Sequence, residues 1–364
     1  MGVNAGGGGG ACGSNNDWGQ YEYALGFGHE FMNGRPGGAD ILADNGVSGV
    51  WLPDGFRAVQ PTPDPSQGAN ALRQPLVCFH GGLQNFDSDL AWIESRPGRQ
   101  VDISFAMIPP ISSSVVLHGD QSQAAAEMKT GAGGGYDSYW KLIGQSLVNS
   151  ELGNAIIRPG WEAGANWFIW SAYVAGEAVY AQYFKRIVED VHSVAPHVQI
   201  AWDVDVSGGA LSGHQTDRSA SGQSDGAYSD QAYPGDRYLD YIDMDIYNAQ
   251  GTPSMVDTFG TANERDSVAW WANYAAQHGK YLGFTEWANE CRGGTRNAVD
   301  SPQFIQNMWD FVSNQANRVA YNTYFEQGVG GCKYGLDGTP KAAAKYEATF
   351  GQAPEGVLPV QSSN

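Results

Sequence analysis

Short apolar runs alternate with helical segments along most of this 364-residue chain, and this alternation limits the possible folds more than any other feature. Strands that alternate with helices predict a parallel sheet. An eighth strand, from Val47–Leu52 or Tyr21–Phe27, would complete a (β/α)8 TIM barrel, so the predicted fold class is α/β with a single barrel domain. Seven runs have the length of buried strands: Pro75–His80, Val101–Ile108, Asn154–Arg158, Val198–Asp203, Tyr241–Tyr247, Lys280–Glu286 and Arg318–Phe325.

The segments between these runs carry apolar residues at helical spacing. Ser301 and Pro302 form a cap and first turn that should open one helix late in the chain. Pro196 should end another helix, before the run Val198–Asp203. The apolar face of that helix is predicted from residues three or four positions apart: Tyr180, Phe184, Ile187, Val191 and Val194.

Composition divides the chain into three parts. Residues 1–20 are rich in glycine and predict a flexible arm, 21–355 form the barrel, and 356–364 form a tail. The arm lacks the apolar segment of a signal peptide, and no apolar stretch reaches the roughly 18 residues of a membrane span. We therefore expect an extracellular protein: a mature secreted form, or a virion component exported without a signal. In the second case the arm would attach the barrel to a larger assembly.

The net charge limits the classes of binding partner, and the cysteine content bears on disulfides and metal sites. The chain has 39 acidic and 20 basic side chains, a formal net charge of -19, which argues against nucleic acid and anionic membranes and favours a neutral partner. Four cysteines do not make a disulfide scaffold in a chain of this length, although Cys291 and Cys332 could be bridged if their loops are neighbours. No cysteine or histidine spacing indicates a metal site, so neither metal nor cofactor is expected.

Two glutamates follow or end predicted strands among aromatic residues. Glu162 comes shortly after the run Asn154–Arg158, and Glu286 ends the run Lys280–Glu286. In a barrel the carboxyl ends of the strands share one face, where functional side chains gather. Burying charge there costs desolvation, so chemistry should explain these residues. Paired carboxylates on one face indicate cleavage of a glycosidic bond.

The surroundings of the two glutamates suggest different roles. Trp161, Trp167 and Trp170 give Glu162 an apolar setting, which should raise its pKa and suit a general acid/base. Glu286 has candidate partners in Tyr247 and Arg158, which would keep it ionised as a nucleophile. Arg158 is four residues before Glu162, so on a strand both side chains would point to the same face. The alternative for Arg158 is a structural ion pair inside the barrel.

Three segments carry a resemblance to a known family. The run Arg158–Trp170 resembles the acid/base segment of glycoside hydrolase family 26 and related clan A enzymes, whose pattern is close to Arg-x-x-x-Glu-x-Asn-Gly-x-Trp-Phe/Tyr-x-Trp. Thr285–Trp287 resembles their nucleophile strand, and Asp243–Tyr247 resembles their sixth strand, whose tyrosine contacts the nucleophile. The resemblance implies a retaining hydrolase of β-mannans or related β-glycans, with Glu162 as acid/base and Glu286 as nucleophile.

The similarity covers roughly residues 75–330, with two departures. Trp161 stands where the family usually has histidine, and Gly164-Ala165 replaces Asn-Gly. Both changes lie next to the reacting sugar, so the predicted substrate is a neutral polysaccharide or oligosaccharide rather than mannan in particular. An alternative class is a glycan-binding barrel with impaired catalysis, such as a phage host-recognition module or a surface lectin. A metal-dependent hydrolase is disfavoured because no histidine lies at ligand spacing on a strand end.

Further residues at the strand ends are predicted to contact substrate. Asp203 and Asp205 would hold sugar hydroxyls, with loop capping as the alternative, and His80 would bind sugar unless it is structural. Glu326 is the rival carboxylate. The predicted substrate contacts, some of which could instead fill the barrel top, are Arg158, Trp161, Asn166, Trp167, Trp170, Trp202, Asp203, Asp205, Tyr247, Trp287, Tyr324 and His80.

Overall fold

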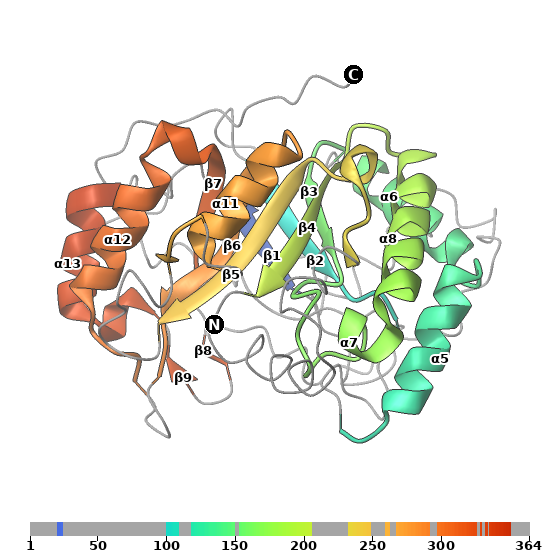
Figure 1. Ribbon diagram of the computed structural model, residues 1–364, viewed down its shortest axis with the longest axis horizontal. Helices are drawn as coiled ribbons and strands as arrows, with labels where there is room; N and C mark the ends of the chain where they lie inside the picture. The colour runs from blue at the N-terminus through green and yellow to red at the C-terminus, as the bar shows by residue number, and fades with distance from the viewer. Residues whose placement is uncertain are drawn as a thin grey trace.

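Seven strands form one sheet in chain order (Figure 1). The first strand pairs antiparallel with the second, and the other five pairings are parallel. The strands are β1 Gln20–Ala24, β2 Gln100–Phe105, β3 Ile156–Pro159, β4 Gln199–Asp205, β5 Tyr241–Asn248, β6 Tyr281–Asn289 and β7 Val319–Tyr324. The computed structural model describes residues 20–24, 100–108, 118–149, 153–205, 232–248, 259–262, 267–291, 297–325, 328–329, 332–333 and 335–350.

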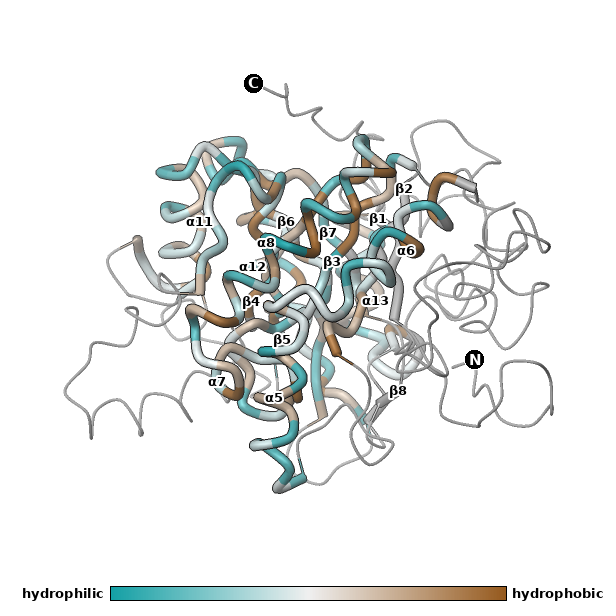
Figure 2. The backbone as a smooth tube through the Cα atoms, turned by 90° about the vertical axis from the view of Figure 1, so that its right-hand side faces the viewer, coloured by the Kyte–Doolittle hydropathy of each residue, from teal (hydrophilic) through white to brown (hydrophobic). Residues whose placement is uncertain are grey.

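Helices cover the outside of this sheet. Figure 1 shows α5, α6 and α8 on one flank and α12 and α13 on the other. Brown and teal residues alternate along the tube in Figure 2, as expected of helices with one face on a core. The helices are α5 Gln121–Ala132, α6 Asp137–Asn149, α7 Ala172–Ala175, α8 Glu177–His192, α11 Val268–Gln277, α12 Pro302–Val312 and α13 Pro340–Thr349. A separate hairpin pairs β8 Gly328–Val329 with β9 Cys332–Lys333.

The buried face of α8 and the cap of α12 were both predicted from the sequence. In α8, Tyr180, Phe184, Ile187 and Val191 are fully buried, as the spacing predicted, whereas Val194 lies beyond the last helical residue. The Ser301 side chain caps α12 by accepting a hydrogen bond from the Phe304 amide, so the predicted cap is confirmed.

Side chains from six strands meet inside the sheet, which is therefore wound into a barrel. Tyr321 of β7 donates to Asp243 of β5 and, at 3.4 Å, to Asp102 of β2. β1 contacts β7 as well as pairing with β2, and within the described ranges no ladder joins β1 to β7. At the amino ends of the strands, Ile156, Tyr241 and neighbouring side chains form a small apolar cluster inside the barrel. Buried acidic residues follow further along the strands, toward their carboxyl ends.

The strand predictions hold from residue 100 onward and need one correction near the start of the chain. The predicted α/β class and barrel are confirmed, and six of the seven predicted runs overlap β2 to β7. The candidate Tyr21–Phe27 overlaps β1, but this strand is antiparallel to β2 rather than parallel as the barrel prediction required. An edge strand can pair in either direction, because both ladders satisfy its backbone groups. Val47–Leu52, Pro75–His80, residues 1–19 and the tail 356–364 lie outside the described residues.

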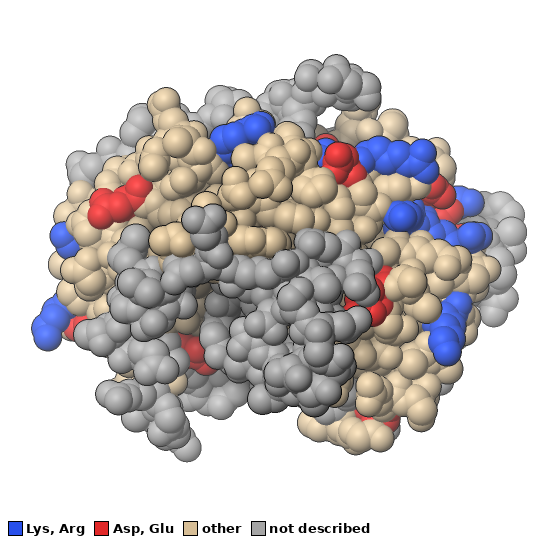
Figure 3. Space-filling model, in the orientation of Figure 1, with Lys and Arg blue, Asp and Glu red and all other residues tan. Residues whose placement is uncertain are grey.

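The described surface carries charges of both signs. On the face shown in Figure 3, acidic and basic side chains are interspersed over the described residues. In the part of the chain that the structure describes, no helix has the length and apolarity to cross a membrane.

Candidate active site

The turn after β3 brings Glu162 to the barrel mouth. β3 ends at Pro159, and the backbone then adopts positive φ at Gly160 (60°) and at Glu162 (51°). Glycine is required at position 160, because a Cβ there would lie 2.3 Å from Sδ of Met107. A glutamate in the left-handed region costs about 1 kcal/mol or more, and such strain is concentrated at functional sites.

This turn corrects one prediction. Arg158 and Glu162 were expected to share a face through strand periodicity, but the strand ends between them, so the turn and not the spacing orients Glu162. Asp203 holds the turn: its Oδ2 accepts from the Glu162 amide at 2.9 Å, and its carbonyl accepts from the Ala163 amide at 3.0 Å. The Trp167 indole Nε1 donates to Oε2 of Glu162 at 2.7 Å. Both the backbone and the side chain of Glu162 are therefore fixed.

Glu286 is held differently, within β6. Arg158 Nη2 donates to its Oε1 at 2.7 Å, and the Tyr247 hydroxyl donates to its Oε2. Both partners predicted for Glu286 are found. A guanidinium and a phenol thus each donate to one carboxylate oxygen, and these charge-assisted contacts fix the orientation of the Glu286 side chain.

Arg158 connects four strands around the site. It is fully buried, and its Nε donates to Oγ of Ser104 at 2.8 Å. Its Nη1 donates to Oδ2 of Asp203 at 3.1 Å and to both oxygens of Asp245 at 2.9 and 3.0 Å, while Nη2 reaches Glu286. The ion pair that the sequence left as an alternative is thus present, and it includes the candidate nucleophile.

One guanidinium therefore faces three buried carboxyl groups. Burial raises the pKa of Asp203 from 3.8 to about 6, and the Arg158 charge opposes this rise. Burial also raises the pKa of Asp245 well above its ordinary value, again against the Arg158 charge. The folded chain therefore binds protons at these two aspartates more tightly than the unfolded chain, so ionising them as pH rises costs stability.

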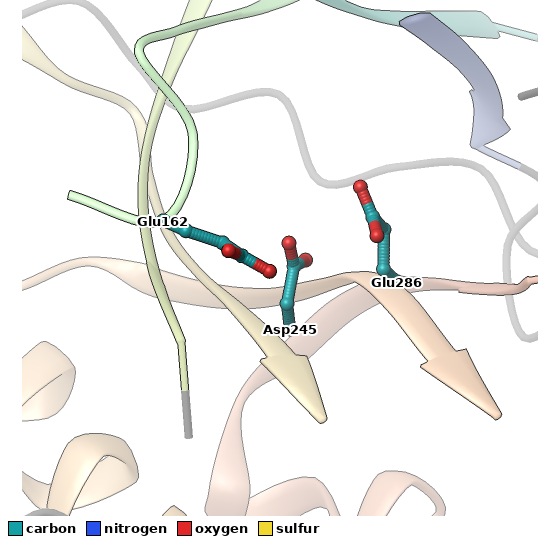
Figure 4. A group of neighbouring side chains, drawn as sticks. All are labelled: Glu162, Asp245 and Glu286. Carbon is teal, nitrogen blue, oxygen red and sulfur yellow. The ribbon is translucent and has the colours of Figure 1, made fainter. Parts of the chain in front are cut away.

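Glu162, Asp245 and Glu286 converge on one point. One carboxylate oxygen from each lies within 4.8 Å of the others, and all three residues are buried (Figure 4). Such a set has the spacing to hold a cation, and the Arg158 guanidinium, bonded to both Asp245 and Glu286, supplies one. Sequence reasoning missed Asp245. The alternation of polar and apolar residues in β5 places Asp245 on the same face as Tyr247, and this signal could have identified it.

A second acidic group lies deeper in the barrel. Oδ2 of Asp243 accepts from the Thr285 hydroxyl at 2.6 Å and from the Tyr321 hydroxyl, which also reaches Asp102. Burial raises the pKa of Asp243 to about 7 and that of Asp102 well above its ordinary value. Gly283 makes room for this group, since a Cβ there would lie 2.2 Å from Oδ1 of Asp243.

The aromatic residues near Glu162 divide into two sets. Asn166 and Trp167 are half-buried beside it and remain candidates for substrate contact. Trp161 and Trp170 are buried, with ring centroids 4.2 Å apart, and the Trp170 indole donates to the Trp161 carbonyl. Phe168 is half-buried and stacks on Trp170 at 4.7 Å. Trp161 and Trp170 thus pack against each other next to the turn, and the sugar contact predicted for them stays a prediction.

Three further predicted stacking residues face the helices instead of the mouth. Trp202 packs against Tyr233 and Trp271, and it is fully buried. Trp287 and Tyr324 contact each other and the aromatic residues of α13. Side chains alternate along a strand, so the neighbours of these three residues face inward. Their packing differs from the predicted position at the mouth, and their contact with a sugar stays a prediction.

Some predicted residues are only partly described. Asp205 is the last residue of β4, and the structure describes only its backbone. His80 and Glu326 lie outside the described residues. Cys291 is disulfide-bonded, as expected of a bridged loop, and its pairing with Cys332 stays a prediction.

Comparisons with known proteins give structural similarities. No known sequence family and no curated protein matches the chain. The structure is similar to GH26C from Muricauda sp., with 18% identity, a TM-score of 0.49, and coverage of 70% of this chain and 67% of that one. It is also similar to a Cellulomonas fimi endo-beta-1,4-mannanase double mutant (18% identity, TM-score 0.42, 66% of this chain and 48% of that one). A third similar structure is the catalytic domain of a Bacillus sp. GH26 endo-beta-1,4-mannanase, with 19% identity and a TM-score of 0.42. The match covers 67% of this chain and 59% of that one. The chain thus spans about half to two thirds of these proteins.

Proposed function

We propose that this chain is a retaining glycoside hydrolase that cleaves a neutral polysaccharide or oligosaccharide by double displacement. The observation that carries this proposal is the approach of the Glu162 and Glu286 carboxylate oxygens to within 4.8 Å at the mouth of the barrel. Retaining enzymes place their two carboxyl groups about 5–5.5 Å apart, whereas inverting enzymes need about 6.5–9.5 Å to admit a water molecule.

The contacts of each glutamate support its role. Glu286, with Arg158 and Tyr247 donating to its two oxygens, is the nucleophile: it attacks the anomeric carbon and forms a glycosyl ester. Glu162 gives its proton to the departing glycosidic oxygen. It then removes a proton from the water that attacks the anomeric carbon and releases Glu286. Two inversions at one carbon give net retention.

Charge and exposure support a neutral sugar as substrate. The net charge of -19 disfavours an acidic glycan. The half-buried Trp167 ring beside Glu162 is the candidate platform for a sugar face. The disulfide at Cys291 supports action in an oxidising compartment outside the cell, where such a bond persists.

A panel of neutral cell-wall and plant glycans, with products identified by mass spectrometry, tests the proposal. The wild-type protein should release oligosaccharides from at least one glycan. The Glu162→Gln and Glu286→Gln variants should melt near the wild-type temperature and release none. Turnover near the wild-type rate in either variant would reject the assignment. Glycan binding without any product from the wild type would favour the alternative of a non-catalytic glycan-binding barrel.

A further inference from the structure

We infer that Asp203 is a positioning residue that fixes Glu162 and Glu286 relative to each other. The inference rests on the proposed function, because it assigns the two glutamates to one reaction. It differs from the sequence prediction, in which Asp203 held sugar hydroxyls. Asp203 is 1% exposed, so no sugar can reach its carboxylate, and a different role must account for a buried charge at this position.

One oxygen of Asp203 serves both glutamates. Its Oδ2 accepts from the Glu162 amide at 2.9 Å and from Arg158 Nη1 at 3.1 Å. The same guanidinium donates through Nη2 to Glu286 at 2.7 Å. A continuous chain of hydrogen bonds therefore runs from the acid/base turn, through Asp203 and Arg158, to the nucleophile.

The turn needs this support because its geometry is unfavourable. Glu162 has φ 51°, a conformation that a non-glycine residue keeps only when its surroundings fix it. The Asp203 side chain holds the Glu162 amide, and the Asp203 carbonyl holds the next amide, that of Ala163, at 3.0 Å. Two successive amides are thus attached to one residue of β4, a strand of the rigid barrel.

The charge of Asp203 links this positioning to pH. Protonation removes its negative charge, which weakens the hydrogen bonds from both the Glu162 amide and the Arg158 guanidinium. Burial raises the pKa of Asp203 to about 6, so its carboxyl group changes charge within the range where enzymes are assayed. Ionisable groups on the elements around Asp203 also act on it, namely Asp102, Arg158, Tyr180, Asp243, Asp245, Glu162 and Glu286.

Asp240 offers a matched control. Its Oδ2 accepts from the Ile200 amide at 2.8 Å, an aspartate-to-amide contact like that of Asp203. It lies just before β5, at the opposite end of the strands from Glu286, and burial raises its pKa too. The Asp240→Asn and Asp240→Ala variants therefore lose an equivalent anchor without disturbing the barrel mouth.

Kinetics on the glycan that the wild type cleaves form the first arm of the test. A misplacement of about 1 Å can cost about 100-fold in rate, so Asp203→Ala should lower kcat by about that factor and leave KM almost unchanged. Asp240→Ala should leave both constants near wild type. A raised KM with kcat preserved would indicate a substrate-binding role and overturn the inference. If Asp203→Ala does not fold, Asp203→Asn replaces it, with the same expected direction in kcat.

The second arm does not require turnover. Nitrogen-15 spectra are recorded on the full chain with Glu162→Gln, so that residue 162 has no ionisable group of its own. Its amide should shift with pH around the Asp203 pKa of about 6, and this shift should vanish when Asp203→Asn is added. The Ile200 amide should keep its own shift in that variant and lose it in Asp240→Asn. A shift of the residue 162 amide that keeps its size after Asp203→Asn is added to Glu162→Gln would overturn the inference. If no glycan is cleaved, the proposed function fails, while this arm still decides whether Asp203 holds Glu162.

Discussion

Glu162 and Glu286 lie within one site, yet the fold holds them by different means. Glu286 belongs to β6, which pairs with β5 and β7. The Arg158 guanidinium and the Tyr247 hydroxyl each donate a hydrogen bond to its carboxylate. Glu162 belongs to a turn beyond β3, where Asp203 holds its backbone and a neutral indole contacts its carboxylate. The strand residue is thus fixed through its side chain, and the turn residue largely through its backbone.

This difference suits the two proposed roles. A nucleophile must point its oxygen at the anomeric carbon, and the ion pair with Arg158 holds the Glu286 carboxylate in one orientation. An acid/base group must lose and regain a proton in each cycle, so a neutral partner such as the Trp167 indole does not lock it in one state.

Removing each carboxylate separates the two roles most strongly. Glu286→Ala should lower kcat by about 10⁴-fold or more, because the covalent step is lost. Glu162→Ala should cost about 10²–10⁴-fold on a natural glycan and far less on a dinitrophenyl glycoside, whose leaving group needs no proton. Added azide should give a glycosyl azide of the substrate's configuration with Glu162→Ala and of the opposite configuration with Glu286→Ala. The reverse pattern would exchange the two assignments.

Arg158 is the next position to change. Arg158→Lys keeps the charge but cannot span Ser104, Asp203, Asp245 and Glu286, so buried carboxylates lose their donors. We expect a loss of about 3 kcal/mol in the free energy of unfolding, measured in urea, together with a loss of activity. The control is Arg186→Lys in the half-exposed pair with Asp137, where less than about 1 kcal/mol is expected. Equal losses at both positions would refute the special role of the buried pair.

The deeper acidic group should make stability depend on pH. The pKa of Asp243 is raised by burial from 3.8 to about 7, so the folded state binds its proton more tightly than the unfolded state. The free energy of unfolding should therefore fall as pH rises between these values, and Asp102, Asp203 and Asp245 add to the same trend.

The Asp243→Asn variant should remove the part of this pH-dependent loss of stability that comes from Asp243. An asparagine oxygen can still accept from Thr285 and Tyr321, so we expect a gain on the order of 1 to 3 kcal/mol near pH 8. Near pH 4 the wild-type carboxyl is already neutral, and the variant should match it within about 0.5 kcal/mol. Thermal or urea unfolding at both pH values measures the difference. An Asp243→Asn variant that is equally destabilised at both would show that the charge is not the cause.

The smallest expected effects compare an inward-facing residue with an outward-facing one. Trp167→Phe removes the indole donor to Glu162 and should lower kcat/KM about tenfold, with stability almost unchanged. Trp287→Phe should cost about 1 to 2 kcal/mol of stability, because its ring fills the space against α12 and α13, and leave kcat/KM within about twofold. Steady-state kinetics and urea unfolding of both variants measure these effects. A large loss of activity in Trp287→Phe would contradict the orientation of β6.

The sequence was sufficient for the barrel because the strand–helix alternation is a local signal. It also predicted the two partners of Glu286, because Arg158, Tyr247 and Glu286 lie on regular strands where position implies direction. It did not anticipate that Trp202 and Trp287 pack against the helices, although each is next to an inward-facing acid on its strand and strict alternation gives this orientation.

Other features have no local signature. The direction of β1 depends on pairing between residues 20–24 and 100–104, which are far apart in the chain. The conformation of Glu162 depends on Asp203, a residue of another strand. The sequence predicted that Asp203 holds sugar hydroxyls or caps a loop, and it gave Asp245 no role of its own. Only the assembled barrel brings Arg158 into contact with both. The contacts between strands therefore had to come from the structure.

The stereochemistry of the first product tests the central claim most directly. Proton NMR can follow the anomeric signals during the first minutes of hydrolysis of a glycan that the wild type cleaves, before mutarotation mixes the anomers. Two carboxylates as close as Glu162 and Glu286 predict that the new reducing end first appears with the configuration of the bond that was cut. First appearance of the opposite anomer would show direct attack by water, and the assignment of Glu286 as nucleophile would be wrong.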